Sequence, residues 1–418
     1  MQSRRILITG LSSHWGGRLA QMLEREPAVE AIIGVDTGDP RHQLDRTEFV
    51  RVDAEHARLR RIIDAAAVDT VVDTRLVHDP LGSGVREAHE VNVVGTSNIL
   101  ASCTGPRSPV RKLVFKSSAE AYGCSSRDPA FFTEEIPRAQ APSTAIERDI
   151  ADAEQAVAEF AARNPETTVT VLRFADSVGP EIRSSFLALL NLSVVPGVFG
   201  FDPRWQLIHE DDVVGVLEHA VRNELAGTFN AAGDGVLVLS EIVSLLGKPL
   251  LPILPPWGTT FAAAQLRRLG LRTPVELLRA LKHGRGLDNR RLKATGYAYR
   301  YTTREAVIKL RAHQRLRPLL RSGPDSYRYE REVEDFLRWS PSVQAVRARG
   351  NGGAADASAP LSGYDELSAD ELVGIIASLE APALHKLREY EASNRARGAV
   401  LDALDRGLSR KGFRVDSN

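Results

Sequence analysis

Two glycines with a serine between them stand where the chain passes from an apolar segment into an amphipathic one. The sequence reads ILITGLSSHWGGRLA, which places Gly10 directly after the apolar segment and Gly16 at the start of the amphipathic one. Glycine at such positions allows a tight turn from a strand into a helix and leaves room for a pyrophosphate at the helix N-terminus. Ser13 lies between them, and we expect its hydroxyl group to donate a hydrogen bond to a phosphate. The segment predicts a dinucleotide-binding turn.

Acidic residues close the next two apolar segments. Asp36 ends AIIGVD, and Asp53 ends FVRVD. A carboxylate at the first position accepts hydrogen bonds from the ribose of an adenosine and repels a 2′-phosphate, so it favours NAD over NADP. We place Asp53 beside the adenine. NAD is therefore the predicted cofactor.

Short apolar segments alternate with amphipathic ones through the first half of the chain and would position these residues. The predicted strands are Arg5–Thr9, Ala31–Val35, Phe49–Val52, Thr70–Asp73, Lys112–Phe115 and Thr168–Phe174. The predicted helices are Arg18–Glu26, His56–Ala67 and Gly95–Cys103. The strands lack strict apolar–polar alternation, which is typical of a parallel sheet covered by helices on both faces. The predicted fold is an α/β Rossmann-type doubly wound parallel sheet.

Composition excludes several classes of protein. The chain has 418 residues, with 54 Lys and Arg against 54 Asp and Glu, so we expect no nucleic-acid-binding role. Its two cysteines, Cys103 and Cys124, exclude a disulfide framework. No segment approaches the ~20 apolar residues that span a bilayer, and the N-terminal sequence leaves no room for a signal peptide. No His, Cys or Asp spacing indicates a metal site. We expect a cytoplasmic protein.

The motifs of this chain, taken in order, resemble those of the extended short-chain dehydrogenases/reductases of the NAD-dependent epimerase/dehydratase family. The resemblance covers roughly Arg4 to Val307. Its marks are Thr9-Gly10 with Gly16, Asn92–Thr96, Lys116–Gly123, Leu172–Pro180, His209–Val213 and Thr228–Gly233. It implies a domain that binds NAD and a C-terminal lobe that binds a nucleotide sugar. It also implies that Ser118 orients a substrate hydroxyl group, that Asn92 belongs to the cofactor site and that Tyr122 lies in a mostly structural stretch.

The catalytic pair of this family is missing. The family transfers a proton through a tyrosine whose pKa is lowered by a lysine four residues later. The corresponding stretch, Gln140–Asp149, places Ser143 and Glu147 at these positions, or Thr144 and Arg148 if the register shifts by one residue. Unassisted serine and threonine hydroxyls do not ionise near neutral pH. Arg148 keeps its proton and is assigned to the cofactor site, where it would orient a ribose or phosphate. The proton carrier is left unassigned.

Other positions also depart from the family. Asp73 and Arg75 end the fourth strand, where they either pair with each other or narrow the nicotinamide pocket. Asp176 and Val178 stand where the family usually has Asn and Tyr. We expect His209 to be a hydrogen-bonded residue at the junction of the two lobes.

The predicted organisation has four parts. Residues 1–180 form the NAD-binding domain, and residues 181–346 form a smaller α/β substrate lobe, with some crossing of the chain between lobes. Residues 347–363 are rich in Gly, Ala and Ser and predict a flexible linker. Residues 364–418 predict a helical module.

A basic amphipathic helix is predicted at Arg304–Arg321, within a segment (residues 265–349) that holds 21 Lys and Arg against eight Asp and Glu. Its apolar face consists of Ile308, Ala312, Leu316 and Leu319. Two interpretations are open. The face packs on the second lobe, or the helix lies on an anionic membrane at the inner face.

The C-terminal module is expected to contain one helix from Ser368 to about Leu379 and a second from Pro382 to about Leu408. Its charged residues leave little apolar surface. We therefore expect it to bind a protein partner or to support a homodimer.

Three functions are consistent with these patterns. The first is an NAD-dependent epimerase/dehydratase that acts on a nucleotide sugar or similar hydroxylated substrate by a variant mechanism. The second is a catalytically silent sensor that binds NAD. The third is a scaffold that has kept only the fold.

Overall fold

A computed structural model describes residues 3–52, 55–79, 84–105, 107–255, 257, 274–316, 376, 381–393 and 396–410. The chain divides into two compact units, Met1–Leu319 and Leu320–Asn418. Among the described residues, no helix is both long and apolar enough to cross a membrane. The predicted linker, residues 347–363, lies outside the described residues.

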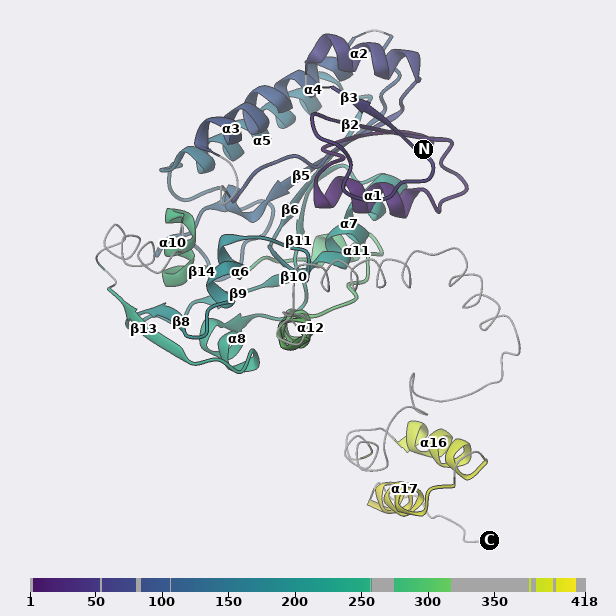
Figure 1. Ribbon diagram of the computed structural model, residues 1–418, viewed down its shortest axis with the longest axis vertical. Helices are drawn as coiled ribbons and strands as arrows, with labels where there is room; N and C mark the ends of the chain where they lie inside the picture. Colours follow the sequence, from purple (N-terminus) through teal and green to yellow (C-terminus); the bar gives the residue numbers. More distant parts are fainter. Residues whose placement is uncertain are drawn as a thin grey trace. The chain divides into compact units, whose positions relative to one another are not determined.

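A seven-stranded parallel sheet forms the centre of the first unit (Figure 1). Its order is β11-β6-β5-β4-β1-β2-β3, so the direction of winding reverses between β1 and β4. In such sheets ligands bind at the carboxyl ends of the strands near this reversal. The strands are β1 (Arg5–Thr9), β2 (Ala31–Asp36), β3 (Thr47–Arg51), β4 (Thr70–Asp73), β5 (Lys112–Ser118), β6 (Thr168–Phe174) and β11 (Gly227–Ala231). The predicted Rossmann-type sheet is confirmed.

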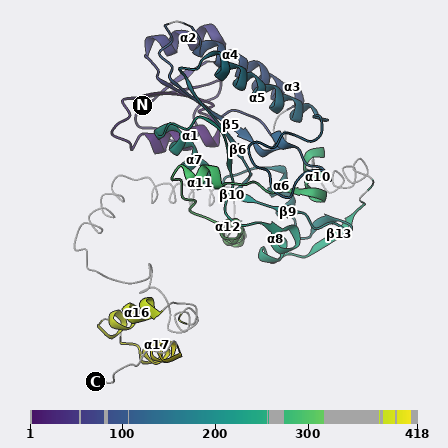
Figure 2. The same ribbon diagram turned by 180° about the vertical axis from the view of Figure 1, so that it is seen from behind.

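Helices cover both faces of the sheet, as Figures 1 and 2 show from opposite sides. One face carries α2 (His56–Ala65), α3 (Val85–His89), α4 (Thr96–Cys103) and α5 (Ala145–Arg163), with a π-helix at Glu90–Gly95. The other carries α1 (His14–Leu23) and α7 (Glu210–Arg222). Alternate residues of β1 therefore enter different cores: Ile6 and Ile8 pack with α1, and Leu7 packs with α2. Burial on both faces explains why the strands lack an alternating pattern.

A smaller lobe follows β6. It contains strand pairs β7 (Asp176–Val178) with β10 (Leu207–His209) and β8 (Val195–Val198) with β13 (Leu250–Leu254). Strands β12 (Leu237–Val238), β9 (Arg204–Trp205) and β14 (Gly284–Arg285) form a third small sheet. Its helices are α6 (Ser185–Leu190), α8 (Leu239–Leu245), α10 (Val275–His283), α11 (Arg290–Ala294) and α12 (Thr303–Leu316), and most of them share one apolar core. The lobe is α/β, as predicted.

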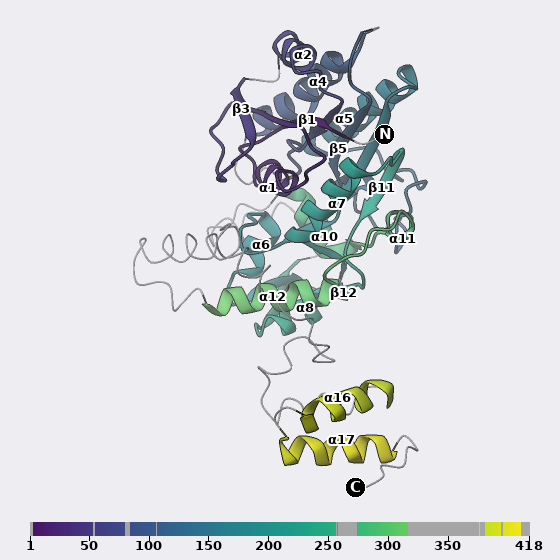
Figure 3. The same cartoon turned by 90° about the vertical axis from the view of Figure 1, so that its right-hand side faces the viewer.

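The structure contradicts one of the two interpretations of the basic helix, that its predicted apolar face packs on the second lobe. Helix α12 lies against α8 (Figure 3), and it buries Ala306, Val307 and Leu310 in the core of the lobe. Ile308, which belongs to the predicted apolar face, is 46% exposed. The buried hydroxyl of Thr303 donates to the carbonyl of Gly235, which sets the helix rotation at its first residue. Residues 317–321 of the predicted helix lie outside the described residues.

In the described part of the C-terminal unit, α16 (Ala381–Ser393) and α17 (Gly398–Arg410) stand where one continuous helix was predicted. Ala396, between them, has a φ of 46°, which is incompatible with a continuing right-handed helix. The turn lets both helices bury apolar residues against each other, and these are Leu384, Leu387, Val400, Leu404 and Leu408, together with Ile376. Apart from Ile376, the predicted helix at residues 368–379 lies outside the described residues.

Candidate functional site

The turn after β1 has the geometry expected of a dinucleotide-binding turn. Gly10 has a φ of 83°, a backbone conformation that favours glycine, and its N–H donates to the carbonyl of Val35. A Cβ atom on Gly16 would overlap the carbonyl oxygen of Gly10. Gly16 is therefore required for α1 to begin close to the end of β1, which aims the N-terminus of α1 at the carboxyl edge of the sheet.

Ser13 caps that helix. Its hydroxyl oxygen accepts a hydrogen bond from the N–H of Gly16 at 3.1 Å and lies 3.4 Å from the hydroxyl of Thr74. Ser13 thus satisfies one of the free N–H groups of the first helical turn. Its expected hydrogen bond to a phosphate stays a prediction.

Asp36 borders a cavity of about 380 Å³ at the ends of β1 and β2. Its carboxylate accepts hydrogen bonds from the N–H and hydroxyl of Ser12 and from the N–H of Thr37, at 2.6–2.9 Å. These bonds hold the carboxylate beside the glycine turn. Cavities of about 300–1,000 Å³ accommodate small ligands, so the space fits the adenosine half of a dinucleotide. Asp53 lies outside the described residues, and its neighbour Val52 lines the cavity.

The other two predicted cofactor residues lie elsewhere. The buried side-chain amide of Asn92 donates to and accepts from the backbone of Val77, with both distances 2.7 Å. Asn92 therefore joins the π-helix to the loop after β4. The side chain of Arg148 is exposed on α5. Gly10, Ser13, Gly16 and Asp36 are brought together, whereas Asn92 supports a neighbouring loop and Arg148 is not among the residues that line the cavity.

Arg75 forms part of the cavity wall, a role that the sequence left open. Its Nε lies 3.1 Å from a carboxylate oxygen of Asp73, which is buried. A Cβ atom on Gly10 would lie 2.6 Å from Cγ of Arg75, and one on Gly95 would lie 2.9 Å from Nη1. The two residues pair, as the first alternative predicts, and Arg75 lines the cavity beside Asp36. A narrowing of the nicotinamide pocket stays a prediction.

The positions of the missing catalytic pair form a buried ionic cluster. Thr144 caps α5, and the Glu147 carboxylate accepts hydrogen bonds from the N–H and hydroxyl of Ser143. Glu147 also pairs with Arg138 at 2.7 Å and Arg279 at 3.0 Å. Burial alone would raise the pKa of Glu147, but the hydrogen bonds of Ser143 and the two arginines outweigh it and lower that pKa. Neither Ser143 nor Glu147 is available as a proton carrier near neutral pH.

Ser118 lies at the end of β5 in a cavity of about 10 Å³, which is room for about one water molecule. Its hydroxyl oxygen accepts from the N–H of Glu120 at 3.2 Å. Lys116, Asp176 and His78 line the same cavity, closed by Trp15, Phe174, Val213 and Arg285. These residues come from α1, β5, β6, β7, β14 and α7 and from the loop after β4, so only the folded chain assembles them.

The titratable groups around Ser118 have shifted pKa values. Burial raises the pKa of Asp176 to about 7, with Arg285 opposing this shift and Glu120 and Asp79 adding to it. Burial lowers the pKa of Lys116 to about 8, against the attraction of Asp73. Groups with pKa values near neutrality, gathered in one cavity, are typical of sites that move protons. The Asn-to-Asp departure at position 176 was the signal in the sequence that pointed here.

Lys116 and Arg285 differ in their partners. The Lys116 ammonium lies 5.5 Å from the ring of Trp15 and 5.7 Å from that of Phe174, and no described carboxylate forms a salt bridge with it. Arg285 forms a 2.6 Å ion pair with Glu120. Glu120 therefore balances the charge of Arg285, whereas Lys116 has no ion-pair partner among the described residues.

Two other candidates have structural positions. The hydroxyl of Tyr122 donates to the side chain of Asn230 at 2.7 Å, and burial raises the pKa of Tyr122. His209 is buried at the start of α7, where its Nδ1 accepts from the N–H of Asp211 and its ring lies against Tyr301. Both arrangements agree with the structural roles expected for these residues.

A second open cavity of about 320 Å³ begins beside the turn that follows Ser118. Four basic side chains line it, those of Arg138, Arg279, Lys282 and His283. Among the described lining residues the acidic one is Asp128. Arg138 and Arg279 share the single charge of Glu147, and burial lowers the pKa of His283, so the positive charge of this wall comes from Lys282 and from the two arginines that exceed one carboxylate. A modest positive charge of this kind fits an anionic ligand.

The Rossmann-type sheet, the glycine turn, the acidic residue after β2 and the smaller second lobe define an extended short-chain dehydrogenase/reductase. The chain belongs to the NAD dependent epimerase/dehydratase family, whose model matches residues 6–232. NAD, the predicted cofactor, is the cofactor of that family. The chain is 35% identical over 309 residues to an uncharacterized protein of Mycobacterium tuberculosis (strain ATCC 25618 / H37Rv). The match covers 72% of this chain and 81% of that protein.

Solved structures share the fold at lower identity. A UDP-glucose 4-epimerase from Thermotoga maritima, solved with UDP-glucose, has a TM-score of 0.57 at 18% identity and covers 75% of this chain and 99% of its own. A dTDP-glucose 4,6-dehydratase from Bacillus anthracis, in complex with NAD, has a TM-score of 0.56 at 17% identity and covers 75% and 97%. At these identities the likeness establishes the fold.

Proposed function

We propose that this protein is an NAD-dependent enzyme of the epimerase/dehydratase type in which Asp176 takes the place of the missing tyrosine as proton carrier. The observation that carries the proposal is that Asp176, with a pKa of about 7, lines the same small cavity as Ser118 at the carboxyl edge of the sheet. A carboxyl group with this pKa exchanges protons near neutral pH more readily than an unassisted serine hydroxyl.

The residues present fit the adenosine half of NAD. The Asp36 carboxylate lines the larger cavity, where it would hold the ribose. The glycine turn, bonded to that carboxylate through Ser12, and the N-terminus of α1 would hold the pyrophosphate. When bound, NAD supplies a hydride acceptor that is regenerated within the reaction cycle. The small volume around Ser118 requires Trp15, Phe174 or Arg285 to move before a nicotinamide and a substrate occupy it.

Each residue of the small cavity has a distinct task in this proposal. Ser118 orients a substrate hydroxyl group, and Asp176 accepts its proton at a carboxylate oxygen. Lys116 places a positive charge where negative charge develops on the substrate oxygen, which lowers the barrier in a site that excludes water. We infer that the substrate is a nucleotide sugar or a similar phosphate-bearing hydroxylated compound, because the neighbouring cavity is lined by Lys282 and by two arginines that share one carboxylate, that of Glu147.

Nucleotide removal followed by calorimetric titration with NAD and NADP is the first test. Turnover of UDP-glucose and dTDP-glucose is then followed by chromatography for the wild type, for Asp176→Asn and for a control, Asp202→Asn. Asp202 is an exposed acid that bonds Ser240 outside the cavity. We expect Asp176→Asn to lose about 10²–10⁴-fold in kcat with unchanged affinity for NAD. Equal activity of Asp176→Asn and wild type would contradict the proposal.

A catalytically silent NAD-binding sensor is the second candidate. The volume of about 10 Å³ around Ser118 favours it, since neither a nicotinamide nor a sugar fits without rearrangement. Tight binding of NAD without turnover of any nucleotide sugar would favour the sensor. Absence of binding to either dinucleotide would favour the third function, a scaffold that has kept only the fold.

We also propose partners for two surfaces. The paired helices α16 and α17 would dock a protein partner or a second copy of the chain, which deletion of residues 350–418 tests through the oligomeric state and co-purifying proteins. The exposed face of α12, with Arg304, Ile308 and Lys309, would contact anionic lipid. Flotation with phosphatidylglycerol vesicles tests this contact, and it would also decide whether the protein is cytoplasmic or peripheral at the inner membrane face.

A further inference from the structure

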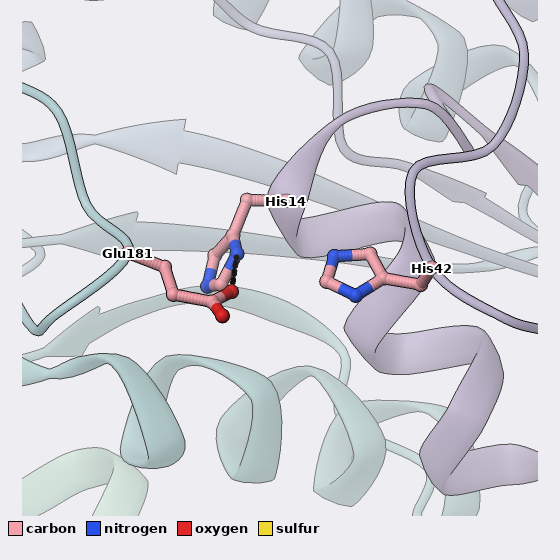
Figure 4. Close-up of side chains that lie close together, drawn as sticks. All are labelled: His14, His42 and Glu181. Carbon is pink, nitrogen blue, oxygen red and sulfur yellow. Dashed lines mark ion pairs between the residues drawn. The ribbon is translucent and has the colours of Figure 1, made fainter. Parts of the chain in front are cut away.

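Three potential metal ligands converge beside the first turn of α1. His14 is the first residue of α1, His42 lies between β2 and β3, and Glu181 follows β7. One nitrogen or oxygen atom of each lies within 4.8 Å of those of the other two. Figure 4 shows the His14 ring between Glu181 and His42, with all three side chains directed toward one another. None of the three lines the cavity around Ser118.

The distance between the ligand atoms of His14 and Glu181 suits a shared cation, and His42 lies within 4.8 Å of both. Nδ1 of His14 lies 3.2 Å from Oε2 of Glu181. Two ligand atoms that are each ~2.0–2.2 Å from one zinc ion at roughly tetrahedral angles lie about 3.3–3.6 Å apart. The rings of His14 and His42 have centroids 5.7 Å apart. A Cβ atom on Gly17 would overlap Cδ2 of His42, so the absence of a side chain at Gly17 lets this ring approach α1.

A buried carboxyl group, that of Glu210, lies next to the cluster. The side chain of Glu210 is 1% exposed, and its Oε2 lies 3.6 Å from Nε2 of His14. Both atoms are buried without a hydrogen-bond partner among the described residues. The backbone N–H of Glu181 hydrogen-bonds to the Glu210 carboxyl group. Glu210 thus touches one candidate ligand and holds the backbone of another.

This arrangement matches a recurring feature of metal sites. A metal-bound histidine generally donates its second ring N–H to a carboxylate, which fixes the tautomer and orients the ring. A proton on Nε2 directed at Glu210 leaves the lone pair of His14 on Nδ1, the atom that faces Glu181. With a cation on Nδ1, Nε2 of His14 and Oε2 of Glu210 would be the donor and acceptor that orient the ring.

We propose that His14, His42 and Glu181 bind one divalent transition-metal ion of the zinc class, with Glu210 as the supporting carboxylate. Two imidazole nitrogens and one carboxylate oxygen favour such ions over Mg²⁺ or Ca²⁺. Three protein ligands leave one coordination position for water or an anion. The ion joins α1 to the loop after β2 and to the segment after β7. The proposal is independent of the proposed catalytic function.

Cobalt titration of untagged, chelator-treated full-length protein tests the site. We expect one equivalent of Co²⁺ to produce visible absorption bands, Zn²⁺ to displace it, and either metal to raise the Tm. His42→Ala is the main variant, because His42 is a half-buried loop residue whose loss leaves the core intact. It should weaken binding by at least tenfold, and Glu210→Gln should weaken it about 10–100-fold.

His56→Ala is the matched control, since His56 is an exposed histidine at the start of α2. It should bind Co²⁺ as the wild type does. A wild type that binds no stoichiometric Co²⁺ or Zn²⁺ would overturn the proposal and leave a simple ion pair between His14 and Glu181. Equal affinities in the wild type and in a His42→Ala, Glu181→Gln double variant would overturn it as well, by placing the metal elsewhere.

Discussion

The hydroxyl of Ser143 donates a 3.0 Å hydrogen bond to the carboxylate of Glu147, at the two positions where the family carries its catalytic tyrosine and lysine. In place of the tyrosine and the lysine that lowers its pKa, this chain has the capped start of α5. There the buried carboxylate of Glu147 pairs with two arginines. Burial shifts the pKa values of Asp176 and Lys116 toward neutrality, and these two residues lie at the start of β7 and in β5, around Ser118.

Glu147→Ala should destabilise the protein by about 3–5 kcal/mol, because it leaves Arg138 and Arg279 without their buried partner. Chemical denaturation at pH 7 measures this change. Since the folded-state pKa of Glu147 is lowered, its contribution is present above its unfolded pKa and is lost as the pH falls through the folded value. The difference between wild type and variant should therefore shrink in acid, and a difference that grows in acid would contradict this role.

Asp176→Asn should stabilise the protein in mild alkali. The raised pKa of about 7 means that the folded state favours the neutral carboxyl group, so wild-type stability falls between the unfolded pKa, near ~4, and about 7. Such a shift corresponds to roughly 4 kcal/mol. Asparagine mimics the neutral form, so the variant should be more stable at pH 8 and equal to the wild type at pH 4. Parallel curves of Tm against pH for the two proteins would argue against a perturbed Asp176.

Asp36→Ala should weaken NAD binding by about 10–100-fold, because the adenosine ribose loses a charged acceptor worth ~1.5–3 kcal/mol. Calorimetric titration measures the loss. Asp39→Ala is the matched control, since Asp39 is an exposed acid in the same loop that pairs with Arg51. Equal losses in the two variants would point to loop charge rather than to a specific contact.

Gly16→Ala should abolish NAD binding and lower the Tm, because the new Cβ would overlap the carbonyl oxygen of Gly10. Gly38→Ala provides the comparison, since its Cβ would meet its nearest neighbour, the Ser12 hydroxyl, at an ordinary 3.5 Å. Thermal unfolding and titration of both variants separate backbone crowding from the general cost of replacing glycine. A Gly16→Ala protein with normal NAD affinity would refute this explanation.

The order of apolar segments, glycines and acids along the chain determined the parallel sheet, the turn after β1 and the family. These features depend on neighbours in the sequence, and the predicted bounds of β1, β4 and β6 match the structure. Local patterns failed where long-range packing chooses between alternatives. In α12, Val307 rather than Ile308 packs in the core of the second lobe. In the C-terminal unit, the chain turns at Ala396, and the helices before and after the turn bury apolar residues against each other.

Tertiary structure alone decided which side chains meet. Asp176 and Ser118 are 58 positions apart in the sequence, yet both line one cavity. They meet because β6 pairs with β5 in the sheet and β7 begins directly after β6. His14, His42 and Glu181 converge from three separate segments, a grouping that no spacing along the chain reveals. Shifted pKa values and metal affinity arise from such neighbours and from exclusion of water, and both are properties of the folded chain.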